Sequence, residues 1–201
     1  MQPYSGPADR NKEPILEVIS DILMASKRVL EVGSGTGQHA LYFSEQMPHL
    51  TWLPSDFAEG YDVLRAQFEQ NSRTNVAAPI ELDVRNIPWD SCLTDHVIDL
   101  VYTANTLHIM SWAAVETFFA GIEQVLGKEG FLVVYGPFKY NGDFTTPSNA
   151  QFDQWLKNRD PVSGVRDFEA VNALAESIGL VLQNDCAMPA NNQCLIWRRS
   201  L

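Results

Sequence analysis

The 201-residue sequence lacks any apolar run that approaches the roughly 20 residues a helix needs to cross a bilayer. Its beginning, MQPYSGPADRNKEP, has no hydrophobic segment of the kind that directs export. Cysteine is scarce: Cys92, Cys186 and Cys194 form no C-x-x-C pair and cannot all pair with one another. These absences favour a cytoplasmic protein that does not associate with membranes, in which the cysteines are small buried hydrophobic residues.

Motifs for metal and nucleophile chemistry are also missing. The four histidines, His39, His49, His96 and His108, show neither H-x-H nor H-E-x-x-H spacing, which argues against a zinc site. The serine of VGSGTG does not stand at the centre of a G-x-S-x-G sequence, so no nucleophile elbow is expected. We therefore expect no metal ion in this protein.

Basic residues are few, since 14 Lys and Arg stand against 25 Asp and Glu, and the formal charge is −11. Such a charge repels polyanions, and the only basic clusters are Lys27-Arg28 and Arg198-Arg199. Nucleic acid is thus not an expected partner, whereas a small molecule or a protein remains open. With 45% hydrophobic and 19% charged residues, we expect one folded domain over residues 1–201, without a linker or repeat.

The sequence does contain a regular alternation of short β-rich runs with amphipathic runs of helical period. The runs at 28–32, 50–54, 79–84, 97–105 and 130–136 predict strands, and 180–184 with 194–198 predict a final antiparallel pair. Helices are predicted between them. The pattern is that of an α/β fold with a mostly parallel sheet and helices on both faces.

Single residues predict where several helices begin and end. We expect a first helix to begin near Pro14, a second over about 38–45, and another that Ser111 caps and Gly127 closes. A last helix is expected over 168–178, with Asp167 as its cap.

The segment 137–149 is the longest stretch that is predicted to be irregular, which is typical of a binding loop or lid. Ser148 and Gln151 at its end form a capping box. They predict a helix with Phe152, Trp155 and Leu156 facing inward.

The stretch VLEVGSGTGQHA, residues 29–40, places the alternating glycines Gly33, Gly35 and Gly37 after a buried strand. Glycine permits positive φ and lets another group approach the backbone, so this turn predicts a floor for a nucleotide-like ligand. Tight packing is the alternative use of such a turn. A dinucleotide fingerprint would require glycine at position 38, which is Gln38. With Glu31 in front, the segment instead reads E-x-G-x-G-x-G.

Carboxylates also follow the next two predicted strands. Asp56 lies 19 positions beyond Gly37 (56 − 37), close to the ~20-residue interval expected for a ribose acceptor, and Asp83 falls at the carboxyl end of the third strand. Open α/β sheets bind ligands at the carboxyl ends of their strands, so we expect Glu31, Asp56 and Asp83 to converge on one ligand. Alternatively, Asp56 caps the helix that follows it.

This combination of a glycine turn with three carboxylates resembles the cofactor site of class I S-adenosylmethionine-dependent methyltransferases. Further stretches resemble one uncharacterised methyltransferase-like family, catalogued as a domain of unknown function, over nearly the whole chain: RNKEPIL, GSGTGQHA, WLPSD, YGPFKYNGDFTTPSNAQFD, GVRDFE and MPANN. The resemblance implies a Rossmann-like fold with a seven-stranded, mostly parallel sheet whose last strand is antiparallel. It also implies binding of S-adenosylmethionine, with S-adenosylhomocysteine as product.

The resemblance also assigns roles to residues of the site. The acidic residue after strand two, here Asp56, accepts both ribose hydroxyls, and Asp83 matches the acceptor for the adenine amino group. S-adenosylmethionine carries an ammonium and a sulfonium but no phosphate, so Glu31 suits it as a further acceptor. The predicted cofactor-binding residues are Glu31, Gly33, Ser34, Gly35, Gly37, Asp56, Phe57, Asp83, Val84 and Asn105.

His108 is the candidate general base, because NTLH follows the fourth strand at the end where the methyl group should lie. Asn105 of the same tetrapeptide should sit closer to the cofactor. The alternative is that His108 is an ordinary hydrogen-bonded loop histidine.

Other polar residues are candidates for the acceptor site or for a lid. Tyr140, Asn149 and Asn191 are predicted to shape the acceptor pocket, together with Asp143, Ser148 and Asn192, although such residues also favour turns. Arg10, Asn11 and Lys12 either fold over the cofactor as a lid or form a solvated terminus.

The sequence as a whole predicts an S-adenosylmethionine-dependent methyltransferase with a small-molecule acceptor, or else a protein acceptor. NTLH lacks the Asn- or Asp-Pro-Pro-aromatic turn of methylases that act on amino groups of DNA bases and on some protein glutamines. One alternative is a protein that binds S-adenosylmethionine without transferring its methyl group. A nicotinamide-dependent oxidoreductase is a third reading, against which Gln38 counts.

Overall fold

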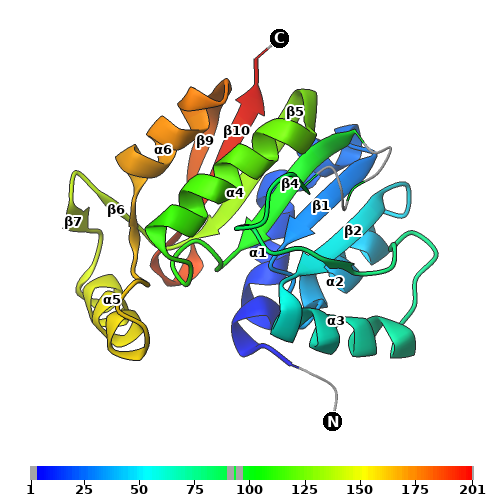
Figure 1. The fold of residues 1–201 in the computed structure, drawn as a ribbon, viewed down its shortest axis with the longest axis horizontal. Coiled ribbons are helices and arrows are strands. Elements are labelled where there is room, and N and C mark those ends of the chain that lie inside the picture. The colour runs from blue at the N-terminus through cyan, green and yellow to red at the C-terminus, as the bar shows by residue number, and fades with distance from the viewer. Residues whose placement is uncertain (1–3, 90–92, 94–96, 201) are drawn as a thin grey trace.

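The computed structural model describes residues 4–89, 93 and 97–200, so Cys92 and His96 lie outside the described residues. Within these ranges, a seven-stranded sheet has the order β3-β2-β1-β4-β5-β10-β9 (Figure 1). The parallel strands are β1 (Arg28–Val32), β2 (Thr51–Asp56), β3 (Ile80–Glu81), β4 (Ile98–Ala104) and β5 (Leu126–Gly136). The strands β9 (Leu180–Met188) and β10 (Asn192–Arg199) are antiparallel. The predicted fold class and final hairpin are confirmed.

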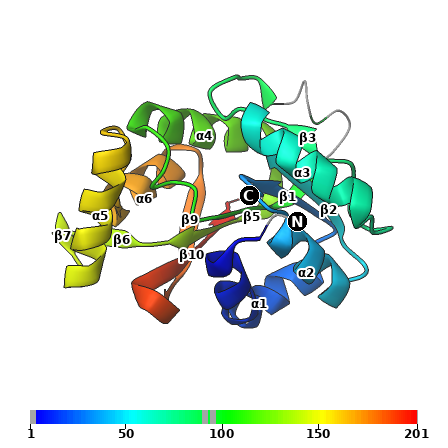
Figure 2. The ribbon, with the colours of Figure 1, turned by 90° about the horizontal axis from the view of Figure 1, so that it is seen from below.

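Helices cover both faces of this sheet (Figure 2). The helices α1 (Gly6–Ala25), α2 (Gln38–Gln46) and α3 (Ala58–Gln70) enclose one apolar cluster, which contains Phe43, Trp52 and Tyr102. The helices α4 (Trp112–Val125) and α6 (Phe168–Ser177) enclose a second cluster on the opposite face, around Phe118 and Trp197. The strand order reverses between β1 and β4, which is where open α/β sheets bind ligands. No helix in the described ranges is both long and apolar enough to span a bilayer.

The segment 137–149, which was expected to be irregular, contains two strands. Within the described part of the chain, β6 (Phe138–Tyr140), β7 (Asp143–Phe144) and β8 (Arg166–Asp167) form a three-stranded sheet beside α5 (Pro147–Arg159). Asn141 and Gly142 join β6 to β7 with φ values of 51° and 80°. Asn-Gly with two positive φ angles is the strongest short hairpin signal, so the prediction failed by overlooking this dipeptide.

The first helix begins eight residues earlier than expected (14 − 6), so the prediction that it starts near Pro14 was wrong. Ser5 caps it, and its side chain accepts a hydrogen bond from the N–H of Ala8 at 3.3 Å. Pro14 lies inside the helix, where it removes one backbone hydrogen bond. The buried stripe Ile15, Ile19 and Leu23 anchors this helix to the sheet and keeps it continuous.

Several other helix ends also differ from expectation. Thr146 caps α5 by accepting from Asn149 N–H at 3.3 Å, so Ser148 and Gln151 are not a capping box. On α5, Leu156 is buried, but Trp155 is 50% exposed and does not face inward. Gly127 is not a helix stop, because β5 begins at Leu126 directly after α4. The cap at Ser111 is confirmed: its side chain accepts from Ala114 N–H at 3.2 Å.

Candidate functional site

The glycine turn joins β1 to α2, and its three glycines have φ values of 76°, 55° and 72°. A Cβ on Gly33 would lie 2.9 Å from the Thr106 side chain, and one on Gly37 would lie 2.9 Å from the Phe68 ring. These two glycines therefore allow close packing of neighbouring elements. A Cβ on Gly35 would meet nothing within 4 Å, so the turn is open to a ligand above Gly35.

Four backbone N–H groups of the turn donate within the protein. Those of Gly33 and Ser34 donate to the carbonyl of Ser55 at 3.0 and 2.8 Å, and that of Gly37 donates to the carbonyl of Ser34 at 2.9 Å. The N–H of Gly35 donates to Asp56 Oδ2 at 2.7 Å. These four groups are thus unlike the backbone donors that hold a pyrophosphate in dinucleotide sites.

Asp56 ends β2 and is 7% exposed. Besides the bond from Gly35, its Oδ1 accepts from Phe57 N–H at 2.9 Å, so the carboxylate fastens the glycine turn to the start of α3. Burial raises the pKa of this carboxyl, while the two N–H donors lower it. Phe57 itself is the N-cap residue and is 47% exposed beside this carboxylate.

Glu31 is 2% exposed and points to the face covered by α1 and α2, where Trp52 Nε1 donates to its Oε2 at 2.9 Å. Its other oxygen lies 3.9 Å from His39 Nδ1. Burial raises the pKa of Glu31 to about 8, and the hydrogen bonds from Trp52 and Ser34 lower it. Burial also lowers the pKa of His39 to about 4, so this imidazole is neutral at neutral pH. Within the described part of the chain, the Glu31 carboxyl therefore sits next to the glycine turn without a cationic partner.

Asp83 follows β3 and has a partner that the sequence reasoning did not consider. Arg85 Nη2 lies 2.6 Å from its Oδ2, and Arg85 Nε donates to both of its carboxylate oxygens. The hydrogen bonds from Arg85 hold the pKa of Asp83 below its usual value. Val84 packs at the edge of the apolar cluster under α4. Asp83 follows the strand that pairs with β2, in which Glu81 lies opposite Asp56, and its contact with adenine stays a prediction.

The amino-terminal helix lies against the glycine turn. Gln38, the residue that breaks the dinucleotide pattern, accepts from Ser5 N–H at 2.5 Å and donates to the Ser5 carbonyl at 3.3 Å. Asn11 is buried, and its Oδ1 lies 2.7 Å from His39 Nε2. Arg10 is exposed on the same helix, and Lys12 forms an ion pair with Asp9 at 2.6 Å. This segment is helical rather than a solvated terminus, and its role as a lid stays a prediction.

His108 lies in the loop after β4 and is 6% exposed. The Phe152 ring of α5 meets it edge-on, with the ring centroids 5.2 Å apart. Arg166 fixes the loop by donating to the carbonyls of Leu107 and Met110. Burial, with a smaller contribution from the charge of Arg166, lowers the pKa of His108 to about 4. Asn105 precedes this loop with a φ of 58°, and its N–H donates to the Tyr135 carbonyl at 2.8 Å.

Two of the predicted acceptor residues, Asn149 and Asn191, contact each other at the turn between β9 and β10. Asn149 is 5% exposed and donates to the Asn191 carbonyl at 2.9 Å, while the Asn191 side chain donates to Ser148 Oγ at 2.9 Å. Tyr140 donates to Asp185 of β9 at 2.7 Å, and burial raises its pKa far above the ordinary value. The start of α5, this turn and β6 are thereby joined.

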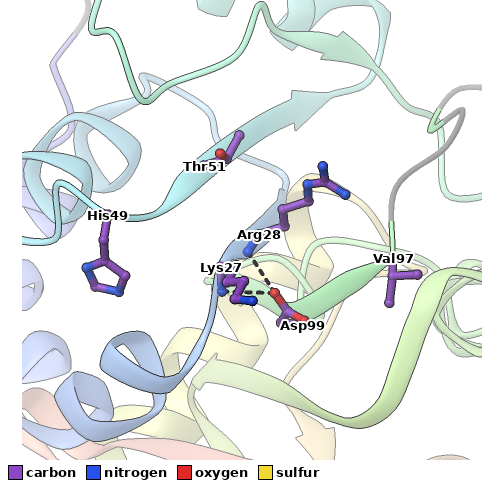
Figure 3. Close-up of a pocket in the computed structure, with 6 residues that line it drawn as sticks. All are labelled: Lys27, Arg28, His49, Thr51, Val97 and Asp99. Atoms are coloured by element: carbon purple, nitrogen blue, oxygen red, sulfur yellow. Dashed lines mark hydrogen bonds between the residues drawn. The ribbon is translucent and has the colours of Figure 1, made fainter.

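An open cavity of about 670 Å³ lies at the opposite, amino-terminal ends of the strands (Figure 3). Lys27, Arg28, His49, Thr51, Val97 and Asp99 line it. There, Asp99 accepts from the backbone N–H groups of Lys27 and Arg28 at 2.9 Å, so its carboxylate supports the entry into β1. The glycine turn, in contrast, follows the carboxyl end of β1, at the other end of the sheet. No group of three or more His, Cys, Asp or Glu in the described ranges could hold a metal ion.

The fold matches solved structures of methyltransferases. An O-methyltransferase family protein from Burkholderia thailandensis superposes with a TM-score of 0.81 at 15% identity, over 96% of this chain and 57% of that chain. Human N-acetylserotonin methyltransferase in complex with SAM matches with a TM-score of 0.76 at 16% identity, over 95% and 52% of the two chains. An O-methyltransferase family 2 protein from Planctomyces limnophilus DSM 3776, in complex with apigenin, matches with 0.71 at 16%, over 86% and 50%.

The protein thus has the fold of the S-adenosylmethionine-dependent methyltransferases, as its glycine turn indicated. Its chain spans between 50% and 57% of the length of these three structures. The chain belongs to the family described as "Protein of unknown function (DUF938)", which matches residues 2–199. The predicted methyltransferase fold and the predicted family of unknown function are therefore both confirmed.

Proposed function

We propose that the protein is an S-adenosylmethionine-dependent methyltransferase that acts on a small-molecule acceptor. The observation that supports this most is the buried Glu31 carboxyl beside a turn in which the N–H groups of residues 33, 34, 35 and 37 already donate within the protein. Such a site offers acceptors to a cationic ligand rather than donors to a phosphate. It favours S-adenosylmethionine over a nicotinamide dinucleotide, with S-adenosylhomocysteine as product.

In this proposal each acidic residue of the site binds a different part of the cofactor. Glu31 accepts from the ammonium, Asp56 from the ribose hydroxyls, and Asp83 from the adenine amino group, with Arg85 as its second partner. The open surface above Gly35 receives the ligand, and Phe57 and Val84 cover its apolar parts. When bound, the cofactor supplies a methyl group that is activated by the sulfonium, so the task of the protein is alignment, which can be worth ~7–11 kcal/mol.

His108 is the proposed general base, since its lowered pKa leaves the imidazole neutral and able to accept a proton at neutral pH. Relatives of the fold that are described as O-methyltransferases favour a hydroxyl as the accepting group. A base is useful for a hydroxyl because the acceptor arrives protonated. A protein acceptor is the second option for this site.

A second candidate function is binding of S-adenosylmethionine without transfer. The pKa of about 4 at His108 favours this alternative, because it makes the imidazole a weak base. Fold and cofactor site alone do not establish turnover.

Calorimetry with S-adenosylmethionine, S-adenosylhomocysteine and NAD tests the ligand class. We expect the first two to bind and NAD not to bind. Asp56→Asn should weaken binding, while Asp62→Asn, an exposed acid on α3, should leave it unchanged. Binding of NAD alone would refute the proposal.

Transfer of radiolabelled methyl groups into a fractionated metabolite and protein extract then distinguishes the methyltransferase from the binding protein. We expect label in a small-molecule fraction. Label confined to polypeptides would indicate a protein acceptor, and no label with intact cofactor binding would favour the binding protein.

His108→Ala should reduce turnover at least about tenfold with nearly unchanged cofactor affinity, because a general base contributes ~10²–10⁴-fold. Steady-state transfer rates and calorimetry on the same preparation measure both quantities. A rate that stays the same across the pH range would contradict the assignment of His108 as base.

A further inference from the structure

Gln193 and His108 lie on the same face of the sheet, and both are next to Gly136. Gln193 of β10 pairs directly with Gly136 of β5, and paired residues of antiparallel strands project to the same face. A Cβ on Gly136 would lie 3.6 Å from Nδ1 of His108. Because Gly136 has no side chain, the Nδ1 edge of the imidazole faces the strand pair to which Gln193 belongs.

The amide oxygen of Gln193 is buried and has no hydrogen-bond partner among the residues that the structure describes. Leaving a buried acceptor unsatisfied is energetically costly, so a donor is expected nearby. A neutral imidazole has one N–H donor and one bare nitrogen. His108, whose Nδ1 lies near Gly136, is therefore a candidate for the missing donor on this face.

Among the residues that the structure describes, none forms a hydrogen bond with a ring nitrogen of His108. The Phe152 ring meets the imidazole edge-on, and the Arg166 guanidinium is purely a donor and already binds carbonyl oxygens. The His108 carbonyl accepts from Gly164 N–H at 2.9 Å, which fixes the backbone but not the tautomer. The carboxylate of Asp185, on the same face of β9, already accepts a hydrogen bond from the Tyr140 hydroxyl.

We propose that Gln193 is a positioning residue that accepts the Nδ1–H of His108 and thereby keeps Nε2 unprotonated. In turnover, Nε2 takes the proton of the acceptor hydroxyl, and the imidazolium that forms keeps its Nδ1–H bond to Gln193. The part of this inference that concerns turnover rests on the proposed methyltransferase function. The part that concerns the tautomer does not.

Nitrogen NMR of the free protein with isotope-labelled histidine measures the tautomer directly. The His108 signals are assigned with a His108→Gln variant. At neutral pH we expect the wild-type imidazole to carry its proton on Nδ1. In Gln193→Leu, which removes the amide oxygen, the proton should move to Nε2.

Gln193→Glu is the rescue variant, since it keeps an acceptor oxygen and should preserve the Nδ1–H tautomer. Gln183→Leu, an exposed position on β9, is the matched control and should change nothing. Where transfer is detected, Gln193→Leu should reduce turnover about tenfold or more without changing cofactor affinity, because a misplaced proton removes the base.

A wild-type imidazole protonated on Nε2, or a tautomer that Gln193→Leu leaves unaltered, overturns the inference. The wild-type measurement decides the question even if Gln193→Leu does not fold. An Nδ1–H tautomer in a protein that transfers no methyl group would support the positioning role and refute the proposed function. Methyl transfer together with a tautomer that Gln193→Leu leaves unchanged would support the proposed function and refute the positioning role of Gln193.

Discussion

At the scale of single residues, Asp56 combines a structural contact with its proposed role in binding. Its two oxygens accept from the N–H of Gly35 in the glycine turn and from the N–H of Phe57 at the start of α3. A Cβ on Gly60 would lie 2.4 Å from Oδ1, so α3 passes directly over the carboxylate. Loss of the side chain should therefore loosen the turn as well as remove the ribose acceptor.

Asp56→Ala should lower the free energy of unfolding by about 1–3 kcal/mol, since two part-buried N–H groups lose their acceptor. Urea denaturation measures this change. Asp62→Ala, whose exposed side chain only approaches Arg65 at 3.7 Å, should stay within about 0.5 kcal/mol of wild type. Equal stability of the two variants would show that the carboxylate does not hold the turn.

The sequence placed Glu31 and Asp56 beside the turn because strand ends and glycine spacing are local features. It did not predict that Trp52 donates to Glu31, that Asn11 contacts His39, or that Gln38 binds Ser5. Those contacts join residues 21 to 33 positions apart, and only the packing of α1 and β2 around the turn creates them. The one available signal was Gln38 itself, a polar residue where the dinucleotide pattern has glycine.

At the scale of elements, Gly37 sets how closely α3 approaches the glycine turn. It has a φ of 72°, and a Cβ there would lie 2.9 Å from the Phe68 ring and 3.2 Å from Leu64. Gly142 in the β6–β7 turn has a similar φ of 80° but nothing within 4 Å of a Cβ. Substitutions at these two glycines therefore distinguish the cost of backbone strain alone from the added cost of disturbed helix packing.

Gly142→Ala should cost about 1–2 kcal/mol of stability, the penalty of a left-handed residue with a side chain. Gly37→Ala should cost a further ~1–3 kcal/mol, because α3 must move to admit the methyl group. Chemical denaturation of both variants tests the difference. Equal losses of stability would mean that the side chains of Phe68 and Leu64 move aside at little cost.

Elements with a strong apolar period were predicted well, since β1 matches its predicted range and α2 ends within one residue of it. The misjudged elements have weak local patterns. The start of α1 is polar, and it is fixed by the Ser5 cap and by contacts with α2. The strands β6 and β7 span three and two residues, too few for periodicity to reveal.

At the scale of the whole molecule, three buried groups make stability depend on pH, and the two histidines act in the opposite direction to Glu31. The pKa values of His39 and His108 are about 4 in the fold against 6.5 ordinarily, so the unfolded chain binds more protons between these values and stability rises with pH. The pKa of Glu31 is about 8 against 4.5, so the folded protein binds the extra proton there and stability falls as pH rises. From these groups together, stability should be greatest near pH 6.5.

Glu31→Gln isolates the acidic member of this set, because glutamine keeps the shape and an oxygen for Trp52 but does not titrate. Both proteins share every other titrating group, so the difference in unfolding free energy, variant minus wild type, reports Glu31 alone. That difference should increase by about 1.4 kcal/mol per pH unit between the two pKa values of Glu31 and level off above the higher one. Urea titrations at several pH values measure it. A difference that is constant with pH would mean that Glu31 is already ionised in the folded protein, and the carboxyl would then meet a cationic ligand with its charge in place.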